Sequence, residues 1–346
     1  MKNVNWIEIE PVDTLFFRGT ESMVAGENHE VDTMFPPMPS TIIGALRTAL
    51  LVQNNIAPGD YLDDPEGCSK KVPMLGTPAT PGFSITGPLF RIGDNVLYPA
   101  PAHWMADIPS DAEDGYEVIA QPGRPLDVDN TIGLKGSVKR PFWVRNPVSA
   151  DMKPLSGYWV NLKAFKAVED NSGLLIVRRG EKTLKSSEPS IIALGDLFVR
   201  EERVGIALNR NRTVREGHLF STVHVRLKPN VFLLVGIESD CECSLKETGI
   251  MQIGGEQRGC SYRFCDAPSL PEKNGGDMLY ALSHIPADIP EKMADAPRAS
   301  SGKLVRSGGW DMEKKFHKPL MAFLPAGTVI SKKDCPEIEL PNCITI

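Results

Sequence analysis

The sequence predicts a turn-rich α+β protein with room for two domains. The chain has 346 residues, of which 41% are hydrophobic and 24% charged, and this is ordinary composition for two globular domains. Its 29 prolines and 30 glycines predict many turns and long loops rather than a helical bundle. Near the N-terminus, a strand-like stretch, an amphipathic helix and a pair of short apolar runs follow one another, which is the order expected of a mixed fold.

Residues 4–18 open this order as a strand, because Trp6, Glu8 and Glu10 alternate with Ile7 and Ile9. A loop containing His29 follows. Prolines then hold residues 35–39 extended, and Ser40 is expected to cap a helix by accepting a hydrogen bond from an early amide. Helical spacing places one apolar stripe on the next residues, which are Ile42, Ala45, Leu46, Ala49 and Leu50.

Gly44 and Arg47 lie off this stripe. A glycine inside a helix costs about 1 kcal/mol relative to alanine, and it often marks a place where backbone or ligand approaches closely. A plain core helix with a tolerated glycine is the alternative, and the helix alone does not distinguish the two.

Residues 58–81 are polar and rich in turn residues, so an irregular connection is expected there. Two apolar runs, 83–92 and 95–105, are separated by Gly93 and Asp94 and predict a β-hairpin. Strand, helix and hairpin in this order are the first steps of a βαββαβ unit, the ferredoxin-like or RRM-like plan.

Charge is distributed unevenly over the following stretch. Residues 101–117 carry five acids and no Lys or Arg, whereas residues 130–145 carry four basic residues and no acid, interleaved with Phe142 and Trp143. Cations and flat rings together are what single-stranded RNA contacts use. Either run alone is equally compatible with solvated loops, and loop aromatics are more often packed against their own domain.

The second half of the chain is mostly strand. A helix is predicted to begin within residues 158–166, and strands at 204–208 and 219–227 flank a tip at 209–217 that carries three arginines. In the second strand His224 and Arg226 share a polar face, which we expect to be open to a partner. Further on, 231–237 is a continuous apolar strand, 254–259 is a glycine-rich loop, and 303–330 predicts a hairpin returning to a sheet.

Composition and spacing exclude several classes of function. The N-terminus lacks an apolar signal core and no stretch approaches the roughly 18 apolar residues of a membrane span, so a cytoplasmic protein without membrane contact is expected. Seven cysteines at scattered spacings favour reduced thiols, and their spacing is not that of a zinc knuckle. No phosphate-binding loop, nucleophile elbow or zinc-protease motif is present, so no cofactor is expected. The net charge of −6 argues against a generic nucleic-acid binder, although a local basic groove remains compatible with it.

Several strings of residues resemble one known family. These are the Pro-Pro-x-Pro-Ser-Thr helix start at 36–41, Gly-Pro-Leu-Phe at 87–90, Tyr-Pro-Ala-Pro-Ala at 98–102, Glu-Arg-Val-Gly-Ile-Ala-Leu at 202–208, Glu-Gly-x-Leu-Phe at 216–220, Gly-Gly-Trp-Asp at 308–311 and Pro-Ala-Gly-Thr-Val at 325–329. The chain thereby resembles the third subunit of the Cmr (type III-B) CRISPR effector complex, a RAMP-superfamily protein. The matches span both ends and the middle of the chain.

The resemblance implies two ferredoxin-like (RRM-like) RAMP domains with long loop insertions, an N-terminal one at 1–195 and a C-terminal one with the glycine-rich loop at 196–346. It implies a non-catalytic subunit that binds the 5′ tag of CRISPR RNA, docks the large polymerase/cyclase-like subunit and joins the backbone Cmr RAMP subunits. In this sequence the candidate RNA-binding residues are Arg18, Arg47, Lys135, Lys139, Arg140, Trp143, Arg210, Arg212, Gly254, Gly255 and Arg258.

Two alternatives stay open at this point. A related RAMP branch cleaves CRISPR RNA without metal by using a histidine, and His29 is the only histidine whose position suggests such a role. The other alternative is a structural scaffold that makes no RNA contact. Cleavage of repeat RNA in EDTA that is lost in His29→Ala would favour the first, whereas salt-sensitive RNA crosslinks at Arg47 or Lys139 would exclude the second.

Overall fold

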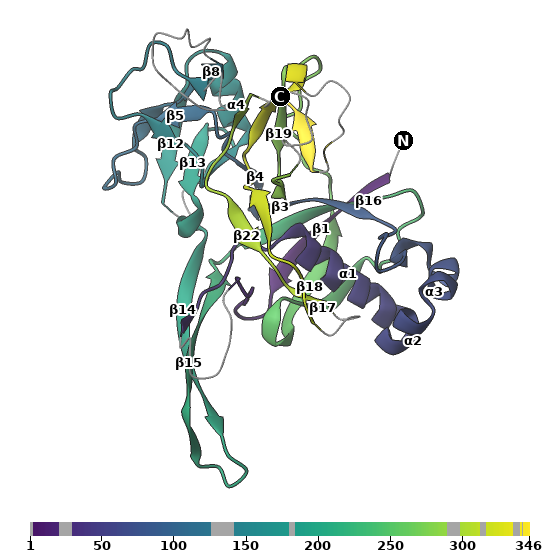
Figure 1. The fold of residues 1–346 in the computed structure, drawn as a ribbon. Helices are drawn as coiled ribbons and strands as arrows, with labels where there is room; N and C mark the ends of the chain where they lie inside the picture. The colour runs from purple at the N-terminus through teal and green to yellow at the C-terminus, as the bar shows by residue number, and fades with distance from the viewer. Residues whose placement is uncertain are drawn as a thin grey trace.

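A ten-stranded sheet forms the body of the protein in the computed structural model, which describes residues 3–20, 30–125, 142–179, 184–288, 298–311, 316–334, 340 and 342–346 (Figure 1). With few helices and many strands, the structure confirms the α+β class. In spatial order the strands are β17 (Thr248–Ile253), β18 (Arg258–Cys265), β1 (Asn3–Pro11), β16 (Val231–Ser239), β3 (Ser84–Ile92), β4 (Asn95–Pro99), β11 (Tyr158–Asn161), β13 (Ser190–Ala193), β12 (Leu174–Arg178) and β6 (Glu117–Ile119).

Helix α1 (Pro39–Gln53) packs on one face of this sheet, against β3 and β17. The five residues of the predicted stripe are all buried, and Leu51 joins them. The predicted Ser40 cap is wrong: the helix begins two residues earlier than a Ser40 cap would place it, Met38 is the N-cap residue, and no side chain caps it. Proline explains the early start. Pro39 has no backbone N–H that would need a hydrogen-bond partner, and its fixed φ suits the first helical turn.

The expectation of an irregular connection at 58–81 is wrong as well, because this segment is largely helical. It forms α2 (Pro58–Asp63), α3 (Pro65–Lys71) and the 3₁₀ turn η1 (Pro73–Leu75), each beginning at a proline. The Asp64 side chain accepts a hydrogen bond from the Gly67 amide at 2.9 Å and caps α3. These prolines start helices rather than break them, since proline is favoured in the first helical turn.

The hairpin predicted at 83–105 is confirmed, since β3 and β4 pair antiparallel through a turn at Gly93 and Asp94. The predicted helix near 158 begins only at Leu162, as α4 (Leu162–Glu169), because the preceding residues form β11. Asn161 ends that strand and caps the helix by accepting from the Ala164 amide at 3.2 Å.

A long two-stranded arm projects from the body (Figure 1). It consists of β14 (Phe198–Leu208) and β15 (Val214–Leu227), which pair antiparallel, and β15 also pairs with the short β2 (Glu30–Val31). β15 therefore begins nearer the tip than the sequence predicted, and β14 begins nearer the base of the arm. The expectation of an open polar face is wrong for His224, which is fully buried at the base of the arm, whereas Arg226 is partly exposed.

The remaining strands form small sheets around the body. They are β5 (Trp104–Ala106), β7 (Gln121–Pro122), β8 (Arg124–Pro125), β9 (Phe142–Trp143), β10 (Lys153–Pro154), β19 (Met278–Ala281), β20 (Ile285–Pro286), β21 (Ala299–Ser300), β22 (Val305–Ser307), β23 (Trp310–Asp311), β24 (Phe316–His317), β25 (Met321–Leu324), β26 (Val329–Ser331) and β27 (Cys343–Thr345), with 3₁₀ turns η4 (Leu194–Asp196), η5 (Gly255–Gln257) and η7 (Lys332–Asp334). The hairpin expected at 303–330 is confirmed by the antiparallel pair of β22 and β25.

The sheet interleaves strands from both halves of the chain. β16 pairs with β1 on one side and with β3 on the other, and β18 pairs with the far side of β1. One large hydrophobic core accordingly includes residues from β1 through β26. The six cysteines that the structure describes are free thiols. Among the described residues, no helix has the length and apolar character needed to cross a membrane.

Candidate nucleic-acid interface

A groove of about 750 Å³ lies where the first helix meets the glycine-rich loop and the C-terminal strands. Segment 17–20 and the outward side of α1 form part of its wall, and the loop after β17 and the ends of β22 and β25 complete it. Arg18 and Lys318 contribute positive charge, and none of its described lining residues is an Asp or Glu. The groove is therefore suited to an anionic ligand.

The side of α1 that faces the groove is small and polar. Thr41, Gly44 and Thr48 follow one another along it, and Ser40 lies in the first turn. Apart from the adjoining backbone of α1 itself, no heavy atom lies within 4 Å of the place that a Cβ on Gly44 would occupy. The glycine thus keeps space open beside the groove, which is the role that sequence periodicity left undecided. The first turn of α1 also contains no acidic residue, so the positive end of the helix dipole is not neutralised there.

The glycine-rich loop reaches the groove through Gly254, Gly255 and Gln257. Gly254 has a φ of +74°, and a Cβ there would collide with the Phe16 carbonyl oxygen, while one on Gly255 would lie 2.8 Å from the Phe16 ring. These two glycines therefore allow the loop to pack against segment 16–17, and the Gly255 amide donates to the Phe16 carbonyl at 2.8 Å. Glu256 and Gln257 follow with φ values of +55° and +52°, a left-handed conformation that costs about 1 kcal/mol or more per residue.

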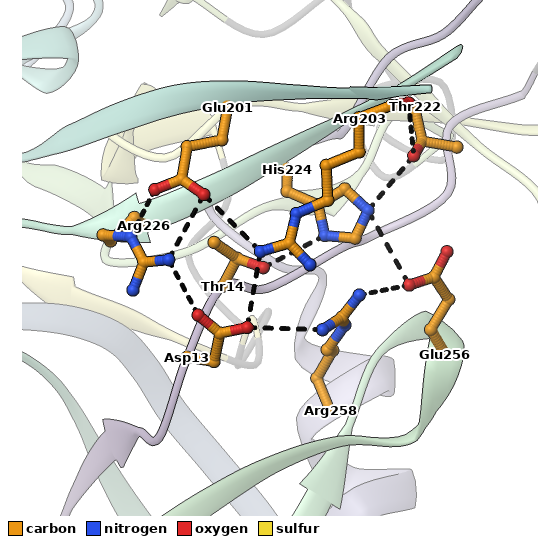
Figure 2. A network of polar contacts seen from close by, with 9 residues as sticks. All are labelled: Asp13, Thr14, Glu201, Arg203, Thr222, His224, Arg226, Glu256 and Arg258. Carbon is orange, nitrogen blue, oxygen red and sulfur yellow. Dashed lines mark hydrogen bonds and ion pairs between the residues drawn. The ribbon is translucent and has the colours of Figure 1, made fainter. Parts of the chain in front are cut away.

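Beside the loop, a balanced network of charges joins it to the base of the arm (Figure 2). Asp13 accepts from Arg226 at 2.7 Å, from Arg203 at 3.3 Å and from Arg258 at 3.5 Å. Its remaining members are Thr14, Glu201, Thr222, His224 and Glu256, which the figure draws with their contacts. Three carboxylates and three guanidinium groups are paired here, so the network is close to neutral.

The network shifts the pKa values of its members in the direction that charge pairing demands. Hydrogen bonds from Arg226 are the largest cause that lowers the pKa of Asp13 and of Glu201 below their ordinary values. Burial lowers the pKa of His224, and the Glu256 carboxylate 3.8 Å away opposes this only in part. At neutral pH the histidine is therefore uncharged, and it joins the network by hydrogen bonds with the Thr14 and Thr222 hydroxyls at 3.2 Å each.

The structure brings together only part of the predicted RNA-binding set. Arg18, Gly254 and Gly255 line the groove. Arg258 is engaged by Asp13 and Glu256 in the network. Arg47 is not among the residues that line the groove, and its Nε is buried and lacks a hydrogen-bond partner.

Arg210 and Arg212 are exposed in the turn of the arm. Trp143, half exposed, lies on β9 opposite Arg124 of β8, in a small sheet outside the groove. Lys135, Lys139 and Arg140, together with His29 of the alternative reading, lie outside the described residues.

Sequence reasoning missed several residues that line the groove. The pair Gly308 and Gly309 belongs to a string that carried the family resemblance, but no role was predicted for this pair or for Lys318. Thr41 and Thr48 lie on the same face of α1 as Gly44, so the off-stripe glycine was a signal that pointed to them. Only the fold shows that the C-terminal strands return to this helix.

Comparison with known proteins places the chain in one family. The family model described as CRISPR-associated protein (Cas_Cmr3) matches residues 7–330. A chain in a cryo-EM structure of the type III-B Cmr-beta complex bound to cognate target RNA and AMPPnP aligns with a TM-score of 0.55 at 17% identity, covering 96% of this chain and 90% of that one. In a second such structure, bound to cognate target RNA, the TM-score is 0.51 at the same identity and coverage. No curated protein matches the chain.

The family match covers far more than half of the sequence, and the structural matches agree with it in fold. The chain therefore belongs to the Cas_Cmr3 family of CRISPR-associated proteins.

Proposed function

We propose that this protein is the non-catalytic RAMP subunit of a type III-B (Cmr) CRISPR effector complex that holds the 5′ tag of CRISPR RNA in the groove beside α1. The observation that carries the proposal is the lining of that groove: two cations, no described carboxylate and glycines on four converging segments. Family membership supports the choice of CRISPR RNA as the ligand.

Single-stranded RNA fits this lining for physical reasons. Arg18 and Lys318 are able to neutralise phosphates, and hydroxyls of the α1 face are able to donate to phosphate or ribose oxygens. Gly44 and the pair at 308–309 leave room for a sugar–phosphate chain to approach main-chain groups closely. The N-terminus of α1 adds the positive end of a helix dipole at the same place.

We also propose two ferredoxin-like units within the single sheet, and the strand order supports this. In the first, β18-β1-β16-β3 lie side by side, and α1 follows β1. In the second, β4-β11-β13-β12 lie side by side, and α4 follows β11, but β12 runs parallel to β13, so this unit shares the strand order of the plan and not its fully antiparallel sheet. Each order places a later strand between the first strand and the strand that follows its helix. The domain boundary at residue 195 stays a prediction.

The proposed partners are the large polymerase/cyclase-like subunit and the backbone Cmr RAMP subunits. The absence of catalysis is part of the proposal. His103 and His224 are buried, and burial lowers the pKa of both, which makes neither a ready acid for cleaving RNA.

The proposal is tested with the complex purified through a tag on this chain. Fluorescence anisotropy would measure binding of an RNA that begins with the repeat-derived 5′ tag, against an RNA of equal length and unrelated sequence. The double substitution of Arg18 and Lys318 by alanine should weaken tag binding and reduce the slope of log affinity against log salt by about 2. The double substitution of Lys70 and Lys71 by alanine is the matched control for loss of two positive charges, because both are exposed at the end of α3 and neither lines the groove.

Unchanged tag affinity in the double variant would contradict the groove assignment. Incubation of repeat RNA with the protein in EDTA addresses catalysis separately, because sustained cleavage would contradict the non-catalytic reading.

A further inference from the structure

One edge of the ten-stranded sheet is a strand whose outer side pairs with no other strand that the structure describes. β17 is its terminal strand, and it pairs with β18 in a regular antiparallel register from Thr248 to Ile253. Two hydrogen bonds fix which main-chain groups point outward: Phe264 N–H donates to the Glu247 carbonyl at 2.9 Å, and Val12 N–H donates to the Gly259 carbonyl at 3.0 Å.

Main-chain direction alternates along a strand. These bonds show that the main-chain N–H and C=O groups of Thr248, Ile250 and Gln252 point away from β18, toward the open edge. Within the part of the chain that the structure describes, no strand or side chain hydrogen-bonds to them there.

This edge lacks the features by which proteins usually protect an edge strand. Its six residues include no proline and no lysine, and its register has no bulge. The Ile250 side chain is 77% exposed, and Thr248 and Gln252 on the same face are exposed too. At the opposite end of the sheet, β6 has only three residues and begins with a glutamate. An unprotected apolar edge of this length is suited to pairing with another chain.

A hollow of about 540 Å³ lies beside the edge and suggests which side chain such a strand brings. Glu8, Glu10, Phe232, Ile250 and Arg263 are among the residues that line it. Glu8 is buried and already pairs with two arginines, Arg91 and Arg263.

Both guanidinium groups lie over the Phe232 ring, with their carbons 5.9 Å from its centroid. The two arginines pair with Glu8 and not with Glu10, whose carboxylate is exposed. An aliphatic stem ending in a cation complements this combination of apolar wall and carboxylate.

We propose that β17 accepts an extended strand from a partner protein, and that a lysine or arginine of this strand enters the hollow beside Glu10. Main-chain pairing would supply the affinity, and the hollow would select the side chain. The exposed Glu10 carboxylate disfavours an RNA occupant, because a phosphate beside it would meet negative charge. The inference rests on the proposed function to the extent that the partner is another subunit of the same complex.

Hydrogen–deuterium exchange tests the strand addition in the assembled complex. The amides of residues 247–253 would be compared in the tag-purified complex and in the chain alone. The outward amides of Thr248, Ile250 and Gln252 should exchange about tenfold or more slowly after assembly, because they become paired. Zero-length carbodiimide coupling should join Glu10 to a partner lysine that lies in an extended segment, and Glu10→Gln should abolish this crosslink.

A pair of variants isolates the edge hydrogen bond. Ile250→Pro removes an outward N–H while leaving the bonds to β18, whereas Ile250→Thr keeps the N–H and removes the apolar chain. Copurification of the partner should be lost in the proline variant and retained in the threonine variant. If the proline variant does not fold, the exchange measurement on the unchanged protein still decides whether β17 pairs with a partner strand.

Copurifying subunits with unprotected edge amides would overturn the strand addition and leave the proposed function standing. Edge amides protected by RNA alone, with no partner protein, would also overturn it. Failure of any subunit to copurify would overturn both.

Discussion

The ring of Phe16 stacks on the imidazole of His224, with the ring centroids 5.1 Å apart and the planes inclined by 20°. The carbonyl of Phe16 also accepts a hydrogen bond from the Gly255 amide. One residue thus contacts both the base of the arm and the loop that lines the groove. Together with the charged network, this contact makes the loop and the arm parts of one packed unit.

Arg258 should affect RNA binding indirectly, by holding this packed unit together, and not by contacting a phosphate group. Its guanidinium pairs with Asp13 and Glu256, so Arg258→Ala would leave the left-handed Glu256 without its ion-pair partner. We expect the free energy of unfolding to fall by about 1–2 kcal/mol, and the tag-RNA affinity to fall severalfold with an unchanged salt slope. Denaturant unfolding and anisotropy at several salt concentrations check this. A salt slope reduced by about 1 would instead identify Arg258 as a phosphate contact.

Gly44 offers a test in which stability and binding should move in opposite directions. Gly44→Ala adds a methyl group into open space on an exposed helix face, so the free energy of unfolding should rise by about 1 kcal/mol. The same methyl group should narrow the groove and weaken tag-RNA binding. Thermal unfolding and RNA titration measure the two effects.

Gly59→Ala in α2 is the matched control, because its Cβ would also meet nothing within 4 Å and Gly59 does not line the groove. An affinity that is unchanged in both variants would argue that RNA does not lie along α1.

The parts of the fold that sequence predicted correctly depend on local periodicity. The stripe from Ile42 to Leu50 and the hairpin turn at Gly93 and Asp94 each follow from residues close in the chain. The helix start was misplaced by two residues because a capping serine and a leading proline are both typical N-terminal signals, and here proline takes the first position.

The site could be predicted only in part because it depends on contacts between distant segments. Arg18 and Lys318 lie near opposite ends of the chain, and only the return of the C-terminal strands brings both to one groove. Arg258 was predicted as a phosphate contact from its place beside the glycine loop. Its neighbour Asp13 lies beyond the end of β1, and no local pattern reveals that the two meet.

Glu8 should be the most sensitive charged position in the sheet. Its carboxylate is buried between Arg91 and Arg263, and Glu8→Gln would leave both arginines without their anion. Because both guanidinium groups retain some access to water, we expect a loss of about 2–3 kcal/mol, below the 3–5 typical of fully buried pairs. Glu10→Gln, two residues along the same face, should change the free energy of unfolding by less than about 0.5 kcal/mol. Urea titration of the two variants provides the comparison, and equal effects would contradict the burial argument.

His103 should make the protein less stable as the pH falls below neutrality. Burial lowers its pKa from 6.5 to about 3, with a smaller contribution from the Arg124 charge. Its ring is in edge contact with Trp104 and Phe142, and its Nδ1 is buried without a hydrogen-bond partner. A group whose folded pKa is depressed contributes stability that is fully present above the unfolded pKa and is lost as the pH falls toward the folded value. Below pH 6.5 the unfolded chain therefore binds a proton that the folded chain refuses.

Each such histidine lowers the free energy of unfolding by up to about 1.4 kcal/mol per pH unit in this window. Burial lowers the pKa of His284 to about 4 and also lowers that of His224, so three groups contribute to the wild-type slope. His103→Gln should remove one of these three contributions between pH 6.5 and 5, where most carboxylates do not yet titrate. Urea unfolding at intervals of half a pH unit measures the slope. A slope unchanged by the substitution would mean that His103 accepts its proton in the folded state, which its burial against two aromatic rings makes unfavourable.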